Sequence, residues 1–378
     1  MLRVAIVYHM WPHYRRAVME ALDRSQKVEY LFVGSGEPFE GILHVDPEAV
    51  SRFRRAPFIV RNRFLWQPQA VELAARGQLD AIIFLGNPNF ISTWVAAWIA
   101  RRRSIPVLFW EHGWRRREGR IKSKLRLLFF ALADRVLVYA PRAKHLGVAA
   151  GYPEDRIDVV YNSLDYAASD RLYSLISSGE LSDVDPDSFF DEPGRPIIIC
   201  TARLTSACRF DLLLEAVDIL RAQGTRCNVL LVGDGPMALA LRELAAARSL
   251  PVHFLGACYD ERILSQLLYR STVTVSPGKV GLTAMHSLMY GTPVITHDND
   301  DEQMPEVEAI REGVTGARFK QNDPQSLANV ICSWIRPDVD RKSVRSHCRE
   351  EIAARWCPEV QAKLIESAIL KVLSHGQA

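Results

Sequence analysis

Short, continuous runs of apolar and β-branched residues alternate with helical patterns along the first 165 residues. The predicted strands cover 2–8, 28–33, 80–85, 105–110, 135–139 and 157–161, and the predicted helices cover 14–24, 67–76, 91–103 and 121–133. A strand that is apolar along its whole length is buried on both faces, and the helices between such strands supply the cover. The first 165 residues therefore predict an α/β domain with a parallel sheet.

The alternation stops at residues 166–195, which are acidic and rich in Ser, Asp and Pro, and which we interpret as a connector. It then resumes, with strands predicted at 197–202, 228–232, 252–255, 273–276 and 293–296 and helices at 211–221, 237–248, 260–269 and 282–290. The second domain is thus expected at 196–340, and helices at 341–378 are expected to pack back toward the first domain. Two Rossmann-like, doubly wound domains that face a central cleft are the simplest architecture, with ligands beyond the carboxyl ends of the strands.

The composition is that of a globular protein of 378 residues, with 48% hydrophobic and 24% charged residues. It excludes a disordered chain, a collagen-like repeat and a disulfide-stapled mini-protein. A formal charge of only +3 argues against a duplex-DNA binder that relies on overall charge. Residues 1–165 carry a net charge of +9, however, and nearly all of it comes from ten cations and two acids within 101–126. The near-neutral total therefore hides one localised basic segment.

The seven cysteines are widely spaced and form no C-x-x-C pair, which favours reduced thiols over a disulfide framework or a zinc site. The first residues have too short an apolar core for a signal peptide, and no apolar stretch approaches the ~20 residues of a spanning helix. We therefore expect a cytoplasmic protein that can lie at the inner face of the cell membrane.

Three loops carry candidate chemistry. Arg203 and Arg209 flank a loop between a predicted strand and a helix, where they suit a diphosphate, although two solvated surface arginines fit the spacing equally well. Gly233 and Gly235 satisfy a dinucleotide pattern, but the strand that ends at Gly256 lacks the acidic residue for a ribose, so a tight turn next to a ligand is favoured over NAD. In the third loop, Lys279 and backbone N–H groups between Gly278 and Leu282 could hold phosphate.

The order and spacing of these loops resemble the retaining glycosyltransferases of the GT-B fold in the large family numbered four. The segments that carry the resemblance are 160–165, 203–216, 231–236, 254–256, 281–295 and 312–316. The resemblance implies transfer of a sugar from a nucleotide-diphosphate donor, without a metal or another cofactor. It implies further that Arg203, Arg209, Lys279 and the backbone of Gly278, Val280, Gly281 and Leu282 neutralise the diphosphate. His286 would hold the ribose, Gly256 and Ala257 the base, and His112 the transferred sugar, although His112 could instead satisfy local backbone.

Several positions depart from the family pattern. Two glutamates eight residues apart are replaced by Gly278 and His286, and Cys208 stands where the family has a lysine next to Arg209. The glycine pair after the first strand is missing, and His13 and Arg15 are candidates for acceptor contact there instead. These departures keep open a catalytically inactive nucleotide-sugar-binding paralogue or scaffold. A nucleotide-sugar epimerase or another NAD enzyme on paired Rossmann domains is a further alternative.

The basic segment suggests where the acceptor is met. Arg115, Arg116, Arg117, Lys122 and Lys124 could attract anionic lipid, at about 1 kcal/mol per cation near a membrane surface. The alternatives are a solvated basic rim on a core helix, or nucleic acid without any recognised motif. We favour the membrane, with a lipid-linked saccharide acceptor in cell-surface polysaccharide or glycan synthesis. The D-x-D spacing of Asp298 and Asp300 would suit a metal, but it lies in a polar loop and we expect no metal there.

Overall fold

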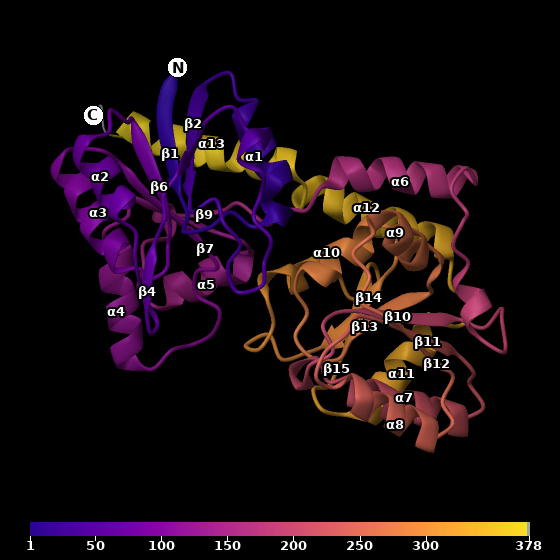
Figure 1. Cartoon of the computed structure of the whole chain (residues 1–378). Helices are drawn as coiled ribbons and strands as arrows, with labels where there is room; N and C mark the ends of the chain where they lie inside the picture. The colour runs from indigo at the N-terminus through magenta and orange to yellow at the C-terminus, as the bar shows by residue number, and fades with distance from the viewer. Residues whose placement is uncertain (376–378) are drawn as a thin grey trace. The chain divides into compact units, whose positions relative to one another are not determined.

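The computed structural model describes residues 1–375, which form two compact units (Figure 1). The first unit combines Met1–Asp165 with the chain from Arg355 onward, and the second unit is Tyr166–Ala354. Each unit is built on its own parallel sheet, which confirms the predicted α/β fold. Within the described residues, no helix combines the length and the apolar character needed to cross a membrane.

The first unit contains a seven-stranded sheet in the order β3-β2-β1-β6-β7-β8-β9, with every neighbouring pair parallel. Its strands are β1 Leu2–Val7, β2 Val28–Gly34, β3 Phe53–Arg55, β6 Ala81–Leu85, β7 Val107–Glu111, β8 Arg135–Val138 and β9 Ile157–Val159. Its helices are α1 Arg16–Asp23, α2 Pro68–Arg76, α3 Ile91–Arg102, α4 Arg120–Phe130, α5 Pro141–Ala149 and α13 Pro358–His375. A separate antiparallel hairpin pairs β4 Ile59–Arg61 with β5 Phe64–Trp66.

The C-terminal helix α13 completes the core of the first unit. Ile365 and Ile369 are fully buried among Val18, Met19 and the inner strands. Polar contacts fix the same helix, because Ser25 Oγ donates a 2.5 Å hydrogen bond to a Glu366 carboxylate oxygen. The two ends of the chain are therefore parts of one hydrophobic core.

The second unit contains a six-stranded parallel sheet in the order β12-β11-β10-β13-β14-β15. Its strands are β10 Ile197–Thr201, β11 Asn228–Val232, β12 Val252–Gly256, β13 Val273–Ser276, β14 Val294–His297 and β15 Gly316–Phe319. Its helices are α6 Tyr166–Ser178, α7 Phe210–Ala222, α8 Ala238–Ala247, α9 Glu261–Arg270, α10 Leu282–Met289, α11 Pro324–Trp334 and α12 Arg341–Arg355. The strand order reverses between β10 and β13, which is the point where sheets of this kind bind ligands.

The segment 166–195, which we expected as a connector, forms part of the second unit instead. It begins with helix α6, and Arg349 of α12 holds that helix by an ion pair with Asp170. The same guanidinium lies 3.5 Å from the ring centroid of Tyr173, and its Nη1 donates to the Met289 carbonyl at 3.0 Å. Thus only α13 of the C-terminal segment belongs to the first unit, whereas α12 belongs to the second.

Candidate nucleotide-sugar site

Three loops at the carboxyl ends of β10, β11 and β12 are joined by backbone hydrogen bonds in the second unit. The Gly233 N–H donates to the Gly256 carbonyl at 2.7 Å, and the Leu204 N–H donates to the Asp234 carbonyl at 3.0 Å. A Cβ on Gly233 would lie 1.9 Å from the Ala202 carbonyl oxygen, and one on Gly235 would lie 2.5 Å from that of Leu204. Both glycines are therefore required for close packing of the loops. This agrees with the tight turn that we favoured over an NAD site from the sequence.

The glycine-rich loop after β13 is fixed against the arginine loop after β10. The Gly278 N–H donates to the Cys208 carbonyl at 3.0 Å, and a Cβ at this position would lie 2.1 Å from the Ala207 carbonyl oxygen. On this backbone the position cannot hold a glutamate, which explains in steric terms why the carboxylate of the family pattern is missing. Two separate candidate loops are thereby brought into one site.

Two of the amides that we expected to hold phosphate are engaged within the protein. Besides Gly278, the Val280 N–H donates to Gln303 Oε1 at 2.8 Å. The side-chain amide of Gln303 in turn donates to Thr296 Oγ1 at 2.9 Å, so the loop is anchored to β14. These two N–H groups therefore do not point to a phosphate, which corrects our expectation for them. Helix α10 begins at Leu282, and the first N–H groups of a helix have no partner within it, so those remain candidates.

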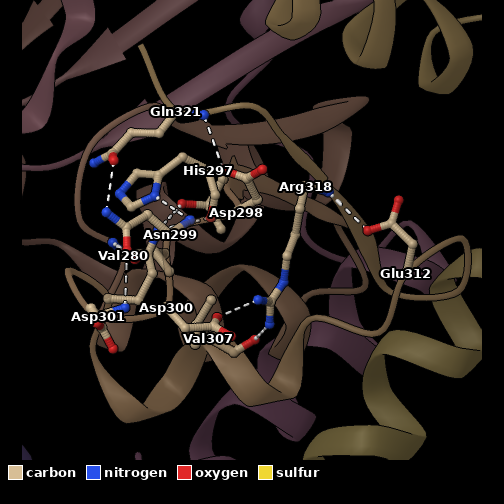
Figure 2. A network of polar contacts seen from close by, with 12 residues as sticks. Val280, His297, Asp298, Asn299, Asp300, Asp301, Val307, Glu312, Arg318 and Gln321 are labelled. Atoms are coloured by element: carbon tan, nitrogen blue, oxygen red, sulfur yellow. Dashed lines mark hydrogen bonds and ion pairs between the residues drawn. The ribbon is translucent and has the colours of Figure 1, made fainter. Parts of the chain in front are cut away.

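Figure 2 shows the polar network that follows β14 and supports this loop. The Asn299 N–H donates to His297 Nδ1 at 3.2 Å, and Asn299 Nδ2 donates to Gln321 Oε1 at 2.8 Å. The two aspartates of the D-x-D spacing are bound separately, since Asp298 accepts from the Gln321 N–H at 3.0 Å and Asp300 pairs with Arg318. In the part of the chain that the structure describes, no cluster of three His, Cys, Asp or Glu side chains could hold a metal ion.

The cationic side chains around these loops differ in their availability. Arg203 is exposed, and its guanidinium has no partner among the described residues. Arg209 adopts the left-handed conformation at φ 53°, where its Nε donates to both Asp211 carboxylate oxygens at 3.2 Å and its Nη1 to Asn322. Lys279 is exposed at the tip of the glycine-rich loop. Arg203 is thus better placed to receive an anion than Arg209, whose guanidinium is already engaged.

His286 on α10 is paired with a carboxylate that the sequence did not single out. The imidazole Nε2 lies 2.9 Å from Glu261 Oε1, and the Tyr290 hydroxyl donates to the same oxygen at 2.5 Å. Burial acts to raise the pKa of Glu261, but the hydrogen bonds and charge of its partners prevail and lower it. Glu261 is 25 residues from His286 and on another helix, so no local motif could have indicated the pair.

In the first unit, His112 directly follows β7 and packs edge-on against Tyr139, with 5.0 Å between the ring centroids. Arg15, which we expected to contact an acceptor, is only 6% exposed and lies within the core. Its Nη2 donates to the Tyr139 hydroxyl at 2.5 Å, and its guanidinium lies 4.8 Å from the Trp110 ring centroid. The structure therefore places Arg15 behind His112, where it positions Tyr139, and only His13 of that pair is exposed.

The basic segment is anchored by one arginine and exposed elsewhere. Arg126 donates to Glu118 at 2.8 Å through Nε, and its Nη1 donates to Glu111 Oε1 at 3.3 Å and to the Gly113 carbonyl at 3.2 Å. Lys122 pairs with Glu118 at 2.9 Å. The other cations predicted to face a membrane are exposed: Arg115, Arg116, Arg117 and Lys124.

Two family descriptions of glycosyltransferases together match most of the chain. The family described as Glycosyltransferase Family 4 matches residues 16–167, and the family described as Glycosyl transferases group 1 matches residues 195–336. The chain belongs to glycosyltransferase family 4. This is the family of retaining, GT-B enzymes that the loop motifs resembled.

Individual relatives are distant. WcaL of Salmonella typhimurium, provisionally named as a colanic acid biosynthesis glycosyltransferase, is 27% identical over 43% of this chain and 42% of its own length. Across the curated relatives compared, the chain spans 21 to 58% of their length.

Two solved structures share the fold over almost the whole chain. Anabaena HepE, solved in complex with UDP, matches with a TM-score of 0.71 and 14% identity over 98% of this chain and all of its own. The lipopolysaccharide outer core galactosyltransferase WaaB matches with a TM-score of 0.70 and 14% identity over 98% of this chain and 99% of its own. At such low identity these matches establish the GT-B fold and nothing more specific.

We predict that Gly278→Ala separates the two loops and weakens nucleotide binding. The added methyl group would overlap the Ala207 carbonyl, so the 276–282 loop must move away from Cys208. Calorimetric titration with UDP should show at least about a tenfold loss of affinity, the change expected from misplacing one or two charge-assisted contacts. Gly119→Ala is the matched control, because that glycine has φ −63° and open space around it. Unchanged affinity in Gly278→Ala would refute the coupling of the loops.

We predict that Glu111 contributes a pH dependence to the stability of the first unit. Burial raises the pKa of Glu111 to about 8, in spite of the nearby Arg126, from its ordinary value of 4.5. Because the folded protein then binds this proton more tightly than the unfolded chain, the stabilising contribution is complete below the ordinary pKa and is lost as the pH rises toward 8. Urea unfolding of Glu111→Gln at several pH values should show a smaller decrease across this range than wild type.

Glu243→Gln, which removes one exposed carboxylate from α8, controls for a simple change in net charge. If Glu111→Gln and wild type lose stability equally between these pH values, the carboxyl group is not protonated in the folded state.

Proposed function

We propose that this chain transfers a sugar, with retention of configuration, from a nucleoside-diphosphate sugar to a lipid-linked saccharide. The observation that carries the proposal is the contact between the Gly278 N–H and the Cys208 carbonyl, which joins the arginine loop to the glycine-rich loop. Arg203 and Lys279 are exposed on these loops, and the N-terminus of α10 begins beside them at Leu282. Two cations and a helix N-terminus are suited to a diphosphate.

The chemistry assigned to these groups is stabilisation of the leaving group. Transfer breaks the bond between the anomeric carbon and the diphosphate, so negative charge grows on the oxygen that departs. Preorganised cations and backbone dipoles at that position lower the barrier, commonly by more than any other single effect. We assign the ribose to His286 with its partner Glu261, the base to the backbone at Gly256 and Ala257, and the transferred sugar to His112.

Proteins with the same fold support a nucleotide-sugar donor and a cell-surface product. Solved complexes of Anabaena HepE contain UDP and UDP-glucose, and WaaB is a lipopolysaccharide outer core galactosyltransferase. WcaL is named for colanic acid biosynthesis. We therefore take UDP-sugars as the first donors to test, and lipid-linked saccharides of cell-surface polysaccharide synthesis as the first acceptors.

One observation favours a second candidate, a protein that binds a nucleotide sugar without transferring it. Position 278 cannot accommodate the carboxylate that the family pattern places there, because the Ala207 carbonyl occupies the space. Chromatography of reaction products from a panel of UDP-sugars and lipid-linked acceptors separates the two candidates. Binding of UDP without transfer to any acceptor would favour the binding protein, and a new glycoside would favour the transferase.

We predict that Arg203→Ala lowers the affinity for UDP by about 10- to 100-fold. The loss of a charge-assisted hydrogen bond to a phosphate costs roughly 1.5–3 kcal/mol, and each 1.4 kcal/mol is a factor of ten. Titration calorimetry measures the change, and Arg262→Ala is the matched control, since that exposed arginine pairs with Asp183 on the same unit. The diphosphate role of Arg203 is wrong if both variants bind UDP like wild type.

The exposed side of α4 supports contact with a membrane. Ile121, Leu125 and Leu128 recur at helical spacing and are 88%, 52% and 63% exposed, while Phe129 and Phe130 are buried. Cations therefore flank an outward apolar stripe, which a solvated basic rim on a core helix would not require. Such a combination is typical of helices that lie at a lipid surface.

We predict that replacing Arg115, Arg116 and Arg117 by glutamine weakens binding to anionic vesicles by roughly 100-fold at low salt, at about 1 kcal/mol per cation. Co-flotation with phosphatidylglycerol-containing vesicles measures the effect. Glutamine at Arg242, Arg270 and Arg336, three exposed positions of the second unit, removes the same charge as a control. Equal flotation of the two triple variants would show that the segment does not direct binding.

A further inference from the structure

The hairpin of β4 and β5 exposes apolar side chains that no core requires. Its register pairs Ile59 with Trp66 and Arg61 with Phe64, so these four side chains share one face. Ile59, Phe64 and Trp66 are 66%, 41% and 37% exposed. A two-stranded ribbon gains little from its own pairing, and soluble monomers seldom leave adjacent large apolar side chains in water. The outer face is therefore expected to meet a partner.

The hairpin is held to the first unit through Leu65, so the exposure of the outer face does not come from a loose segment. Val60, which is paired with Leu65 on the inner face, is 45% exposed. Leu65 is only 4% exposed, and its N–H donates to the Asn89 carbonyl at 3.1 Å. Directly after β5, the buried Gln67 donates through Nε2 to the carbonyls of Tyr8 and Ala56, at 3.1 and 2.9 Å. The hairpin is thus a fixed part of the first unit, and its apolar face points outward.

The charge around the hairpin selects an anionic partner. Residues 49–71 contain five arginines and no acidic residue. Arg52 pairs with Glu29 and Arg54 with Glu72, which leaves Arg55, Arg61 and Arg63 without a carboxylate partner among the described residues. The Arg63 guanidinium lies 5.1 Å from the Phe64 ring centroid, so cation and aromatic ring are presented together. An electrically neutral apolar partner would leave these three charges uncompensated.

Neighbouring helices continue the same combination of cations and apolar groups. Helix α3 packs against β5 of the hairpin, and on this helix Trp98 is 52% exposed with the Arg102 guanidinium 4.7 Å from its ring centroid. The next helix is α4, whose Phe129 ring lies 4.7 Å from that of Trp94 on α3. In Figure 1 the hairpin, α3 and α4 lie along one side of the first unit. Three adjacent elements of this composition make an extended surface, which fits a bilayer better than a small ligand.

We propose that the β4–β5 hairpin is a membrane anchor whose outer face enters the interfacial region of an anionic lipid bilayer. Tryptophan and phenylalanine favour the level of the lipid headgroups, and Arg55, Arg61 and Arg63 would contact the phosphates beside them. This deepens the proposed function, on which it rests for the membrane as partner, by adding an insertion element to the electrostatic contact of α4. The hairpin would set how deeply the protein enters the bilayer, whereas the basic segment would attract the protein to the anionic lipid from a distance.

Vesicle partition of the full chain tests the anchor. Phe64→Ser combined with Trp66→Ser should lower partition into vesicles of phosphatidylcholine and phosphatidylglycerol by about tenfold or more, because two interfacial aromatic anchors are lost. Leu239→Ser, at a 69% exposed apolar position of the second unit, is the matched control. Equal partition of the double variant and wild type would overturn the proposal. Light scattering gives a second test. If the mass of the wild-type chain doubles with concentration and that of the double variant does not, the partner of the hairpin is a second copy and the proposal is overturned.

Tryptophan fluorescence supplies a readout of depth. Brominated lipids should quench wild type more than Trp66→Phe, a variant that keeps the apolar face and should still bind. Equal quenching would place Trp66 outside the bilayer and contradict insertion. UDP titration of the serine double variant separates this test from that of the proposed function. Normal UDP affinity with weak partition of the double variant supports the anchor, whereas a wild-type chain that partitions fully but does not bind UDP would refute only the transferase.

Discussion

The short contact between the Gly278 N–H and the Cys208 carbonyl is the constraint on which the candidate donor site depends. It requires a residue without a side chain, because the Ala207 carbonyl lies where a Cβ would be placed. The arginine loop is in turn packed against the β11 turn through Gly235, so three strand ends are connected by backbone alone. These connections use none of the charged side chains on the loops.

This arrangement changes how the departures from the family pattern are understood. Gly278, at the position where the family pattern has a glutamate, lets the two loops touch, and the Val280 N–H is bonded to Gln303. Arg209 adopts the left-handed backbone conformation, and its side chain is held by Asp211 and Asn322. His286 has acquired Glu261 as a partner. The candidate site therefore still contains a carboxylate, that of Glu261, although neither position of the family's glutamate pair holds one.

In the first unit, two arginines with little exposure hold the candidate functional segments in place. Arg15 fixes Tyr139 behind His112, and Arg126 ties the base of α4 to Glu111 and Glu118. Cations that are paired within the protein stabilise the fold of the first unit. Cations that are exposed lie next to outward-facing apolar side chains on α4 and the hairpin. Under the proposed function, a division of this kind would let the unit keep a fixed core and still contact a membrane at its surface.

Apolar strand patterns predicted eleven of the thirteen strands in the two described sheets to within two residues at each end, because fully buried parallel strands leave a continuous signal. The pattern missed the edge strands β3 and β15 and both strands of the hairpin, and β3, β4 and β5 have only three residues each. For the hairpin, the arginines without acids around it were the signal that could have indicated a surface element. Loop motifs singled out Arg203, Gly278 and His286 as site residues, and this assignment stays a prediction. They could not show that Arg15 is buried or that Glu261 reaches His286, since both depend on partners distant in sequence.

A crystal structure of the chain with UDP tests the central claim most directly. We expect both phosphates to lie in the second unit, within hydrogen-bonding distance of the Arg203 guanidinium and next to the loop at 279–282. The Gly278 N–H should remain bonded to the Cys208 carbonyl. UDP bound away from Arg203, or a Gly278 amide that has left Cys208 to hold phosphate, would contradict it.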